Sequence, residues 1–280
     1  MNWLSCIAAA VLIAGCNKKI EPVSLGTSPD GQLSRYDLIT ADYDINPVTA
    51  FTASYDKNGK LANLFEKVGQ SQFSFNLTYE SDRLVRASAS DQSVQQLSYD
   101  GAGRVLQINY TTLTDTGKIV YTYDVSGKVV ALLDSVQKPL SLPIRNQYLF
   151  TYDDAGNNVI KIVHNTLDLK GRATIQNLSF YSFDDKSNPF KVFPCLRYAN
   201  LLPGEMPALV NKNNIVTSQL VGTILNPASP GSQPQYDTIT TYRTSRTYEY
   251  TANGLPSTAT EHFENKQFSY SGNRTFKYEY

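Results

Sequence analysis

The chain has 280 residues and balanced charge, with 25 Lys plus Arg against 25 Asp plus Glu. Zero net charge without a polybasic run argues against a nucleic-acid partner, and the length is sufficient to bury one large core. The 19 Tyr and 12 Phe against a single Trp favour strands, because aromatic side chains suit a half-buried pleated surface. We therefore expect an all-β protein in which helix is the minority state.

The N-terminal stretch predicts a signal peptide over residues 1–15. Its apolar, uncharged run is shorter than the roughly 20 residues that a membrane span needs. The run ends in Ala14, Gly15 and Cys16, which resemble the lipobox of bacterial lipoproteins, although the first residues supply no Lys or Arg. The resemblance implies cleavage before Cys16 and lipid attachment at its thiol, which makes the membrane a partner.

The next residues fit an exported, lipid-anchored protein. Residues 16–35 are polar and contain Gly and Pro, so we expect a flexible tether between the anchor and a domain over 36–280. Cys6 leaves with the signal peptide, and Cys195 then has no cysteine to pair with. We expect Cys195 to be buried and inert.

A short phrase recurs along this domain: an aromatic residue, Asp, two variable positions, Gly, a basic residue and an aliphatic one. Apolar residues alternate before each aromatic anchor, which predicts a strand. Asp opens a turn and Gly accepts a positive φ, so each unit reads as a β-hairpin. The predicted anchors are Tyr55, Tyr79, Tyr99, Tyr123, Tyr152, Phe183, Tyr250 and Tyr270.

The phrase resembles the YD repeat of RHS-type surface proteins, and most closely the short YD-repeat-like lipoproteins of Bacteroidetes. "FDDKSNPF" at 183–190 and "NKNNIV" at 211–216 resemble further phrases of those lipoproteins. The resemblance implies no activity and no catalytic residues. The unit at Tyr79 lacks the Gly, so its turn must differ. We expect one antiparallel sheet of repeated YD-type hairpins, as a curved open sheet or half-barrel, while barrel and open spiral fit the same hairpins.

The stretch over about 186–235 departs from the repeat because it carries seven prolines, which are poorly tolerated in central strands and helices. We interpret it as an insertion that plugs an end or concave face of the sheet, with a short helix near 195–202.

Candidate chemistry is sparse. The adjacent carboxylates at 153–154 and 184–185 are better explained by turns than by a calcium site, and His164 and His262 fit no metal-binding pattern. We expect both histidines on the strand surface, no metal site and no cofactor. Most tyrosines should fill the core. If an aromatic patch binds a ligand, our candidates are Tyr242, Tyr248, Tyr250, Phe276, Tyr278 and Tyr280.

We therefore expect a non-catalytic cell-envelope lipoprotein whose repeat-built β scaffold binds a glycan, a lipid or an envelope protein. One alternative is a carrier that wraps a lipid or small apolar ligand in the curved sheet, which an open apolar cavity would favour. Another is a glycan-active enzyme with two carboxylates roughly 5–10 Å apart in a cleft. The outer membrane is the expected location, on its periplasmic or surface face.

Overall fold

The computed structural model describes residues 33–41, 48–68, 71–192, 211–226, 235–266 and 268–280. These residues form sixteen antiparallel strands and one 3-10 helix, so the predicted all-β class is confirmed. The strands are β1 (Arg35–Ala41), β2 (Val48–Tyr55), β3 (Leu61–Val68), β4 (Ser71–Glu80), β5 (Arg83–Ala89), β6 (Val94–Tyr99), β7 (Val105–Thr111), β8 (Thr116–Tyr123), β9 (Val129–Gln137), β10 (Ile144–Tyr152), β11 (Val159–Leu167), β12 (Ala173–Ser187), β13 (Asn213–Asn226), β14 (Gln235–Tyr250), β15 (Pro256–Asn265) and β16 (Tyr270–Glu279). The 3-10 helix, η2, is Pro189–Val192.

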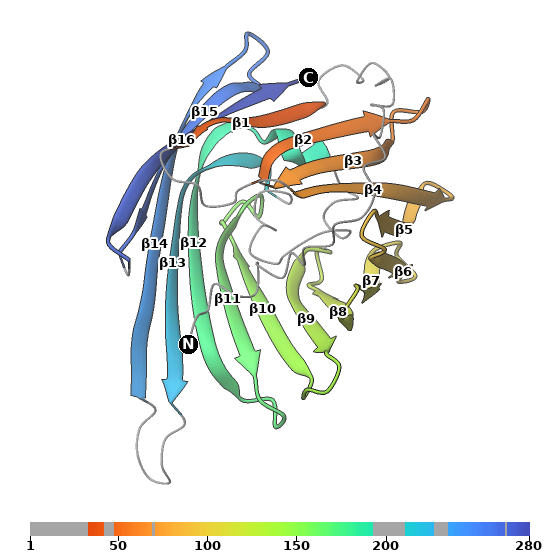
Figure 1. Ribbon diagram of the computed structural model, residues 1–280, viewed down its shortest axis with the longest axis vertical. Helices are drawn as coiled ribbons and strands as arrows, with labels where there is room; N and C mark the ends of the chain where they lie inside the picture. The colour runs from red at the N-terminus through yellow and green to blue at the C-terminus, as the bar shows by residue number, and fades with distance from the viewer. Residues whose placement is uncertain (1–32, 42–47, 69–70, 193–210, 227–234, 267) are drawn as a thin grey trace.

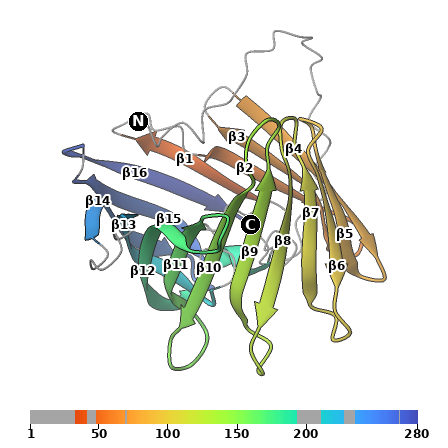
Figure 2. The same ribbon diagram turned by 90° about the horizontal axis from the view of Figure 1, so that it is seen from below.

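Each strand pairs with its neighbours in the sequence, and the strand order closes on itself through β1. β1 pairs with β2 on one side and with β16 on the other. Figure 1 shows these first and last strands together, and Figure 2 shows the strands following one another around the curved wall. The sequence alone did not predict whether the curved sheet closes. The pairing of β1 with β16 joins its two ends.

The repeated phrase forms a turn at one end of the hairpins. After β6, Asp100 Oδ1 accepts hydrogen bonds from the N–H groups of Ala102 and Arg104, both at 2.9 Å. The Arg104 N–H in particular holds the pKa of Asp100 below its ordinary value. Gly103 adopts a φ of 79°, and its N–H bonds to the Asp100 carbonyl at 3.0 Å. The same bond from Gly N–H to Asp carbonyl closes the turns that begin at Asp56, Asp124 and Asp153.

The anchoring tyrosine of each hairpin binds the hairpin before it. Tyr123 Oη donates to the carbonyl of Val105, the aliphatic residue of the preceding phrase, at 2.7 Å. The guanidinium carbon of Arg104, the basic residue of that phrase, lies 4.6 Å from the centre of the Tyr123 ring. The tyrosine, the basic residue and the aliphatic residue therefore recur together because they meet between hairpins. Equivalent bonds from tyrosine to carbonyl are made by Tyr55, Tyr79, Tyr99, Tyr152, Tyr248 and Tyr280.

We expect Tyr123→Phe to lower the free energy of unfolding by about 1 kcal/mol, measured by urea denaturation. The ring still packs, but the Val105 carbonyl loses its donor. Val125→Ala is the control, because Val125 is fully exposed in the adjoining turn; it should change the value by less than about 0.5 kcal/mol. Equal stability of Tyr123→Phe and the wild type would contradict the proposed role of this bond.

Two units of the repeat differ from the regular phrase. The turn after Tyr79 is indeed different, as predicted: Ser81 and Asp82 have φ values of 45° and 69°, so two successive left-handed residues connect the strands. A further Asp-x-x-Gly turn, unnoticed in the sequence, connects β11 to β12 at the other end of the sheet, where Asp168 Oδ1 accepts the N–H of Arg172 at 2.8 Å.

Two predicted anchors are wrong. Phe183 lies within β12, paired with Ile215, instead of ending a strand. Tyr270 begins β16, and the glycine that follows, Gly272, is buried within the strand. Tyr280 takes the anchoring role in this part of the sheet, since its Oη donates to the Pro256 carbonyl at 2.9 Å.

The predicted insertion over 186–235 also needs correction. Its central part is β13, a 14-residue strand that pairs with both β12 and β14. The prolines of the segment all lie outside β13, at 189–207 and 227–234, whereas β13 itself is free of proline. The short helix predicted near 195–202 lies outside the described residues, and the helical turn that is described is η2.

The inner face of the sheet carries the core, and a polar network adjoins it. Tyr110 Oη donates to Asp134 at 2.8 Å, and burial raises the pKa of Asp134. His164 stacks on Tyr148 with ring centres 4.2 Å apart, and its Nε2 lies 3.2 Å from Asn146 Oδ1. The surface position predicted for His164 is therefore wrong. The fully buried aliphatic side chains of the core include Leu33, Leu64, Val105, Ile108 and Val159.

Burial lowers the pKa of His164 to about 4, below its ordinary value of 6.5. The unfolded chain therefore takes up a proton at this residue before the folded chain does, so stability falls as the pH falls from about 6.5 to 4. We expect this residue to account for a loss of about 2 kcal/mol, allowing for its partial exposure. In His164→Gln the denaturation midpoint should change less with pH across this range than in the wild type. A pH dependence equal to that of the wild type would contradict the assignment.

Candidate functional site

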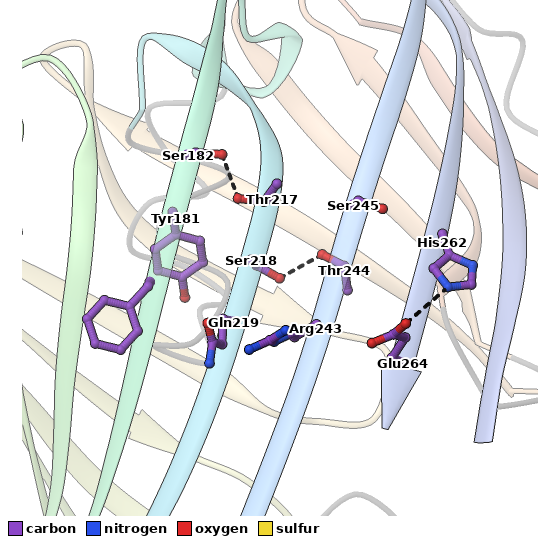
Figure 3. A pocket seen from close by; sticks show the side chains of 11 residues that line it. Tyr181, Ser182, Thr217, Ser218, Gln219, Arg243, Thr244, Ser245, His262 and Glu264 are labelled. Atoms are coloured by element: carbon purple, nitrogen blue, oxygen red, sulfur yellow. Dashed lines mark hydrogen bonds and ion pairs between the residues drawn. The ribbon is translucent and has the colours of Figure 1, made fainter. Parts of the chain in front are cut away.

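The long strands β12, β13, β14 and β15 carry a trough on the face of the sheet opposite the core (Figure 3). Its volume is about 530 Å³, and two rows of side chains form its walls. The strand register aligns Phe180, Gln219, Arg243 and Glu264 in the first row, and Ser182, Thr217, Ser245 and His262 in the second. Tyr181, Ser218 and Thr244 lie between the rows and contribute their backbone to the floor, because their side chains alternate with those of the walls and point to the inner face. We call this feature the outer trough.

Strand geometry sets the dimensions of the outer trough. Four neighbouring strands span about 14 Å at a spacing of about 4.8 Å, and the two rows are about 7 Å apart because they are two residues apart along each strand. The trough therefore runs across the strands, and its walls present a side chain at every strand. Such a shape suits an elongated ligand lying perpendicular to the strand direction.

The walls are polar and carry both charges. His262 and Glu264 are each 46% exposed, with His262 Nε2 3.8 Å from Glu264 Oε1. This exposure confirms the prediction that His262 lies on the strand surface. Arg243 is exposed, and among the described residues no hydrogen bond or ion pair engages its guanidinium group. Figure 3 shows Arg243 extending toward Gln219 rather than toward Glu264.

One hydroxyl contact lies within the second row, where Ser182 Oγ and Thr217 Oγ1 are 2.5 Å apart. The His262 ring bonds outside the row, to Asn273 on β16, with Nδ1 3.0 Å from Oδ1. On the first row, Phe180 is 37% exposed and stands at the end of the trough. Lys161 on β11 lies over its ring at 5.7 Å from the centre.

The inner face of the same strands carries a buried ion cluster instead. Glu261 is 2% exposed and lies 2.6 Å from Arg246 Nε and 3.5 Å from Arg274 Nη1. Arg274 also lies over the Phe263 ring, 4.4 Å from its centre, and donates to Tyr242 Oη at 3.3 Å. Alternation along β15 thus separates a structural carboxylate, Glu261, from the exposed Glu264 of the trough.

The aromatic residues predicted as ligand contacts lie on this inner face. Tyr248 and Tyr280 donate to backbone carbonyls, and Tyr250 donates to Asp184. Desolvation, followed by the bond to Asp184, raises the pKa of Tyr250. Phe276 and Tyr278 are core residues, at 4% and 6% exposure. The fold thus uses these rings, with Tyr242, for packing and hydrogen bonding, and their role in ligand binding stays a prediction.

The two further phrases noted in the sequence meet in an asparagine clasp, formed by Asn158, Asp184, Asn188, Asn211, Asn213 and Asn214. Asn211 is fully buried, and its Oδ1 accepts the N–H of Val159 at 2.6 Å. Asn188 Nδ2 donates to the Asn211 carbonyl at 3.0 Å. Asn214 N–H donates to Asp184 Oδ1 at 3.2 Å. The clasp therefore holds "FDDKSNPF" and "NKNNIV" against the turn that follows Tyr152.

The outer trough was missed because its residues lie on four separate strands. Alternate polar positions are ordinary on an exposed strand face, and only the register brings these together. Cys16 and Cys195 lie outside the described residues. Within the described part of the chain, no three His, Cys, Asp or Glu side chains gather as a metal site would require. Nor does any described segment form a helix with the length and hydropathy of a transmembrane span.

Comparison with solved structures supports the fold. A porin-like protein from Bacteroides uniformis ATCC 8492 is 13% identical, with a TM-score of 0.53 over 92% of this chain and 99% of that one. A porin-like protein from Bacteroides vulgatus ATCC 8482 is 11% identical, with a TM-score of 0.53 over 90% and 99% of the two chains. At such identities the likeness concerns the fold alone.

Comparison of sequences identifies the repeat. No curated protein matches the chain. The Teneurin YD-shell family model matches residues 35–182, which is more than half of the sequence. The matched region holds the hairpins whose tyrosine, basic and aliphatic residues meet between units. The chain is therefore a repeat-built β scaffold that belongs to the Teneurin YD-shell family.

Proposed function

We propose that the protein is a non-catalytic lipoprotein of the bacterial cell envelope that binds a ligand in the outer trough. The observation that carries this proposal is the alignment of eight exposed or half-exposed side chains along two walls, where the guanidinium group of Arg243 has no hydrogen-bond or ion-pair partner within the described part of the chain. Exposed polar side chains aligned in rows, with a guanidinium group available for bonding, are typical of a recognition surface.

The number of carboxylates in the trough favours ligand binding over hydrolysis of a glycan. Glycosidases place two carboxyl groups on either side of the scissile bond. Of the residues that line the trough, Glu264 alone carries a carboxylate, and Glu261 on the same strand is buried on the opposite face. The packed rings and ion cluster of the inner face also support a binding scaffold over a carrier that encloses an apolar ligand.

The proposed envelope location rests on the lipobox-like residues that end in Cys16. Its partner there is the membrane, which a diacylglycerol thioether and an N-acyl chain at Cys16 would hold. The porin-like neighbours from Bacteroides fit the same compartment.

The anchor is tested by the intact mass of the native protein extracted from membranes with a gentle detergent. We expect a mass that begins at an acylated Cys16, and soluble, unacylated protein for Cys16→Ala. A mass that begins at Met1 would overturn the lipoprotein proposal. The ligand-binding part is tested by Ser245→Trp, which places a large side chain in the trough: ligands retained by the wild type in the same extraction should be lost.

A further inference from the structure

We propose that the ligand of the outer trough is a short, neutral oligosaccharide lying across β12 to β15. The inference rests on the proposed binding function of the trough and adds the chemical class of its ligand. It follows from three features of the walls: their mixture of hydrogen-bond donors and acceptors, their cancelling charges, and the aromatic ring at one end.

The hydrogen-bonding groups match a row of sugar hydroxyls. A hydroxyl both donates and accepts, and so do Ser182, Thr217, Ser245 and the amide of Gln219. Arg243 adds several N–H donors, while Glu264 adds acceptors. A ligand that needs only donors or only acceptors would leave part of each wall without a partner, and groups left without a partner weaken binding.

Within the two walls the charges oppose a charged ligand, whereas Lys161 on β11 adds a cation just beyond the first row, so an anionic sugar is titrated in parallel. An anionic ligand would meet Glu264, and a cationic one would meet Arg243, which is directly opposite in the strand register. His262 lies near Glu264 and adds positive charge only when protonated. One guanidinium and one carboxylate group can instead bond neighbouring hydroxyls of an uncharged sugar, because charge-assisted hydrogen bonds are stronger than neutral ones.

The end of the trough offers a surface for the apolar side of a sugar ring. Phe180 is 37% exposed, although the same face of the sheet is otherwise polar at this row. Lys161 lies over the ring, and the exposed part of the ring is accessible to a ligand. A flat aromatic face combined with polar neighbours recognises ligands that are apolar on one side and polar at the edge.

The topology argues against an extended peptide bound as an added strand. That mode of recognition requires an unpaired sheet edge. Each of the sixteen described strands pairs on both sides, so none of them offers such an edge. A ligand of the trough must therefore be recognised by side chains, which favours a molecule with hydrogen-bonding groups along its whole length.

The test is isothermal titration calorimetry of the full chain with maltotriose, cellotriose and β-1,4-mannotriose. We expect at least one to bind with an affinity that changes little between low and high salt, because the ligand is uncharged. Phe180→Ala and Arg243→Ala should each weaken binding about tenfold. Arg86→Ala, an exposed arginine on β5 outside the trough, should leave it unchanged.

Trigalacturonate and tetraglutamate, titrated in parallel, distinguish the alternatives. Tighter, salt-sensitive binding of trigalacturonate would overturn the neutral class while leaving a ligand-binding trough intact. Binding of tetraglutamate that Ser245→Trp abolishes would replace the sugar with a peptide. The absence of binding by all three neutral sugars would overturn the oligosaccharide proposal. The trough itself would be rejected if native ligands of the wild type were also retained by Ser245→Trp.

Discussion

Glu261→Gln should lower the free energy of unfolding by about 3 to 5 kcal/mol, measured by urea or thermal denaturation. Gln keeps the shape of Glu but removes its charge. Arg246 and Arg274 would then share the inner face with no carboxylate at 2.6 and 3.5 Å. Arg274 has little capacity to compensate, since its Nε already has no hydrogen-bond partner among the described residues.

Glu264→Gln is the matched control, because Glu264 lies on the same strand but points to the exposed face. It should change stability by less than about 0.5 kcal/mol. A second variant separates loss of charge balance from loss of packing: Glu261→Leu combined with Arg246→Met and Arg274→Met removes all three charges. We expect it to recover much of the stability lost by Glu261→Gln, because a buried ion cluster replaced by apolar groups is often tolerated. Wild-type stability of Glu261→Gln would show that the cluster contributes nothing.

The local part of the fold could be predicted from the sequence. An Asp followed by Gly three residues later, as in Asp100 and Gly103, gives a turn whose chemistry is contained within five residues. Alternating apolar residues before each tyrosine then predict the hairpin. The partner of each tyrosine was not predictable in the same way, because the Val105 carbonyl bonded by Tyr123 belongs to the hairpin before it.

The positions of the anchoring tyrosine and its turn were predicted incorrectly where the hairpins are longer. Tyr270, followed closely by Gly272, looks like an anchor and turn, yet both lie in β16 because the turn there precedes them and includes Ser269 at a φ of 52°. In 186–235 the prolines outweighed the alternating residues of β13, although every proline lies outside that strand. Composition averaged over a long segment hides a strand that a shorter window would reveal.

The outer trough could not be predicted at all, because it depends on register. Phe180 and Glu264 are more than 80 residues apart and meet at one row only because three strand pairings align them. A shift of one residue in any pairing would turn half of the row to the inner face. The long strands that build the trough lie where the repeat is least regular, so the same departure from the phrase that misled the sequence interpretation creates the site.

Asn211→Ala is expected to lower the free energy of unfolding by about 3 kcal/mol. It leaves the buried N–H of Val159 without its acceptor at 2.6 Å, which costs about 1 to 3 kcal/mol, and it adds the cost of a small cavity. The effect should be local as well as global. Amide hydrogen exchange should show faster exchange at Val159 than in the wild type, because the bond from its N–H no longer forms.

Asn253→Ala provides the control, since Asn253 is exposed in the turn between β14 and β15. It should change stability by less than about 0.5 kcal/mol and leave the Val159 amide unaffected.

Asn211→Asp adds a sharper test: it retains an acceptor for Val159 but places a negative charge in a site that is 0% exposed. If the clasp acts through the hydrogen bond, the Val159 amide should exchange faster in Asn211→Asp than in the wild type near neutral pH. Its protection from exchange should recover at acid pH, where the carboxylate is protonated. Protection at Val159 that is the same in all three proteins would mean that packing of the two phrases, and not the Asn211 amide, holds them against the hairpin of Tyr152.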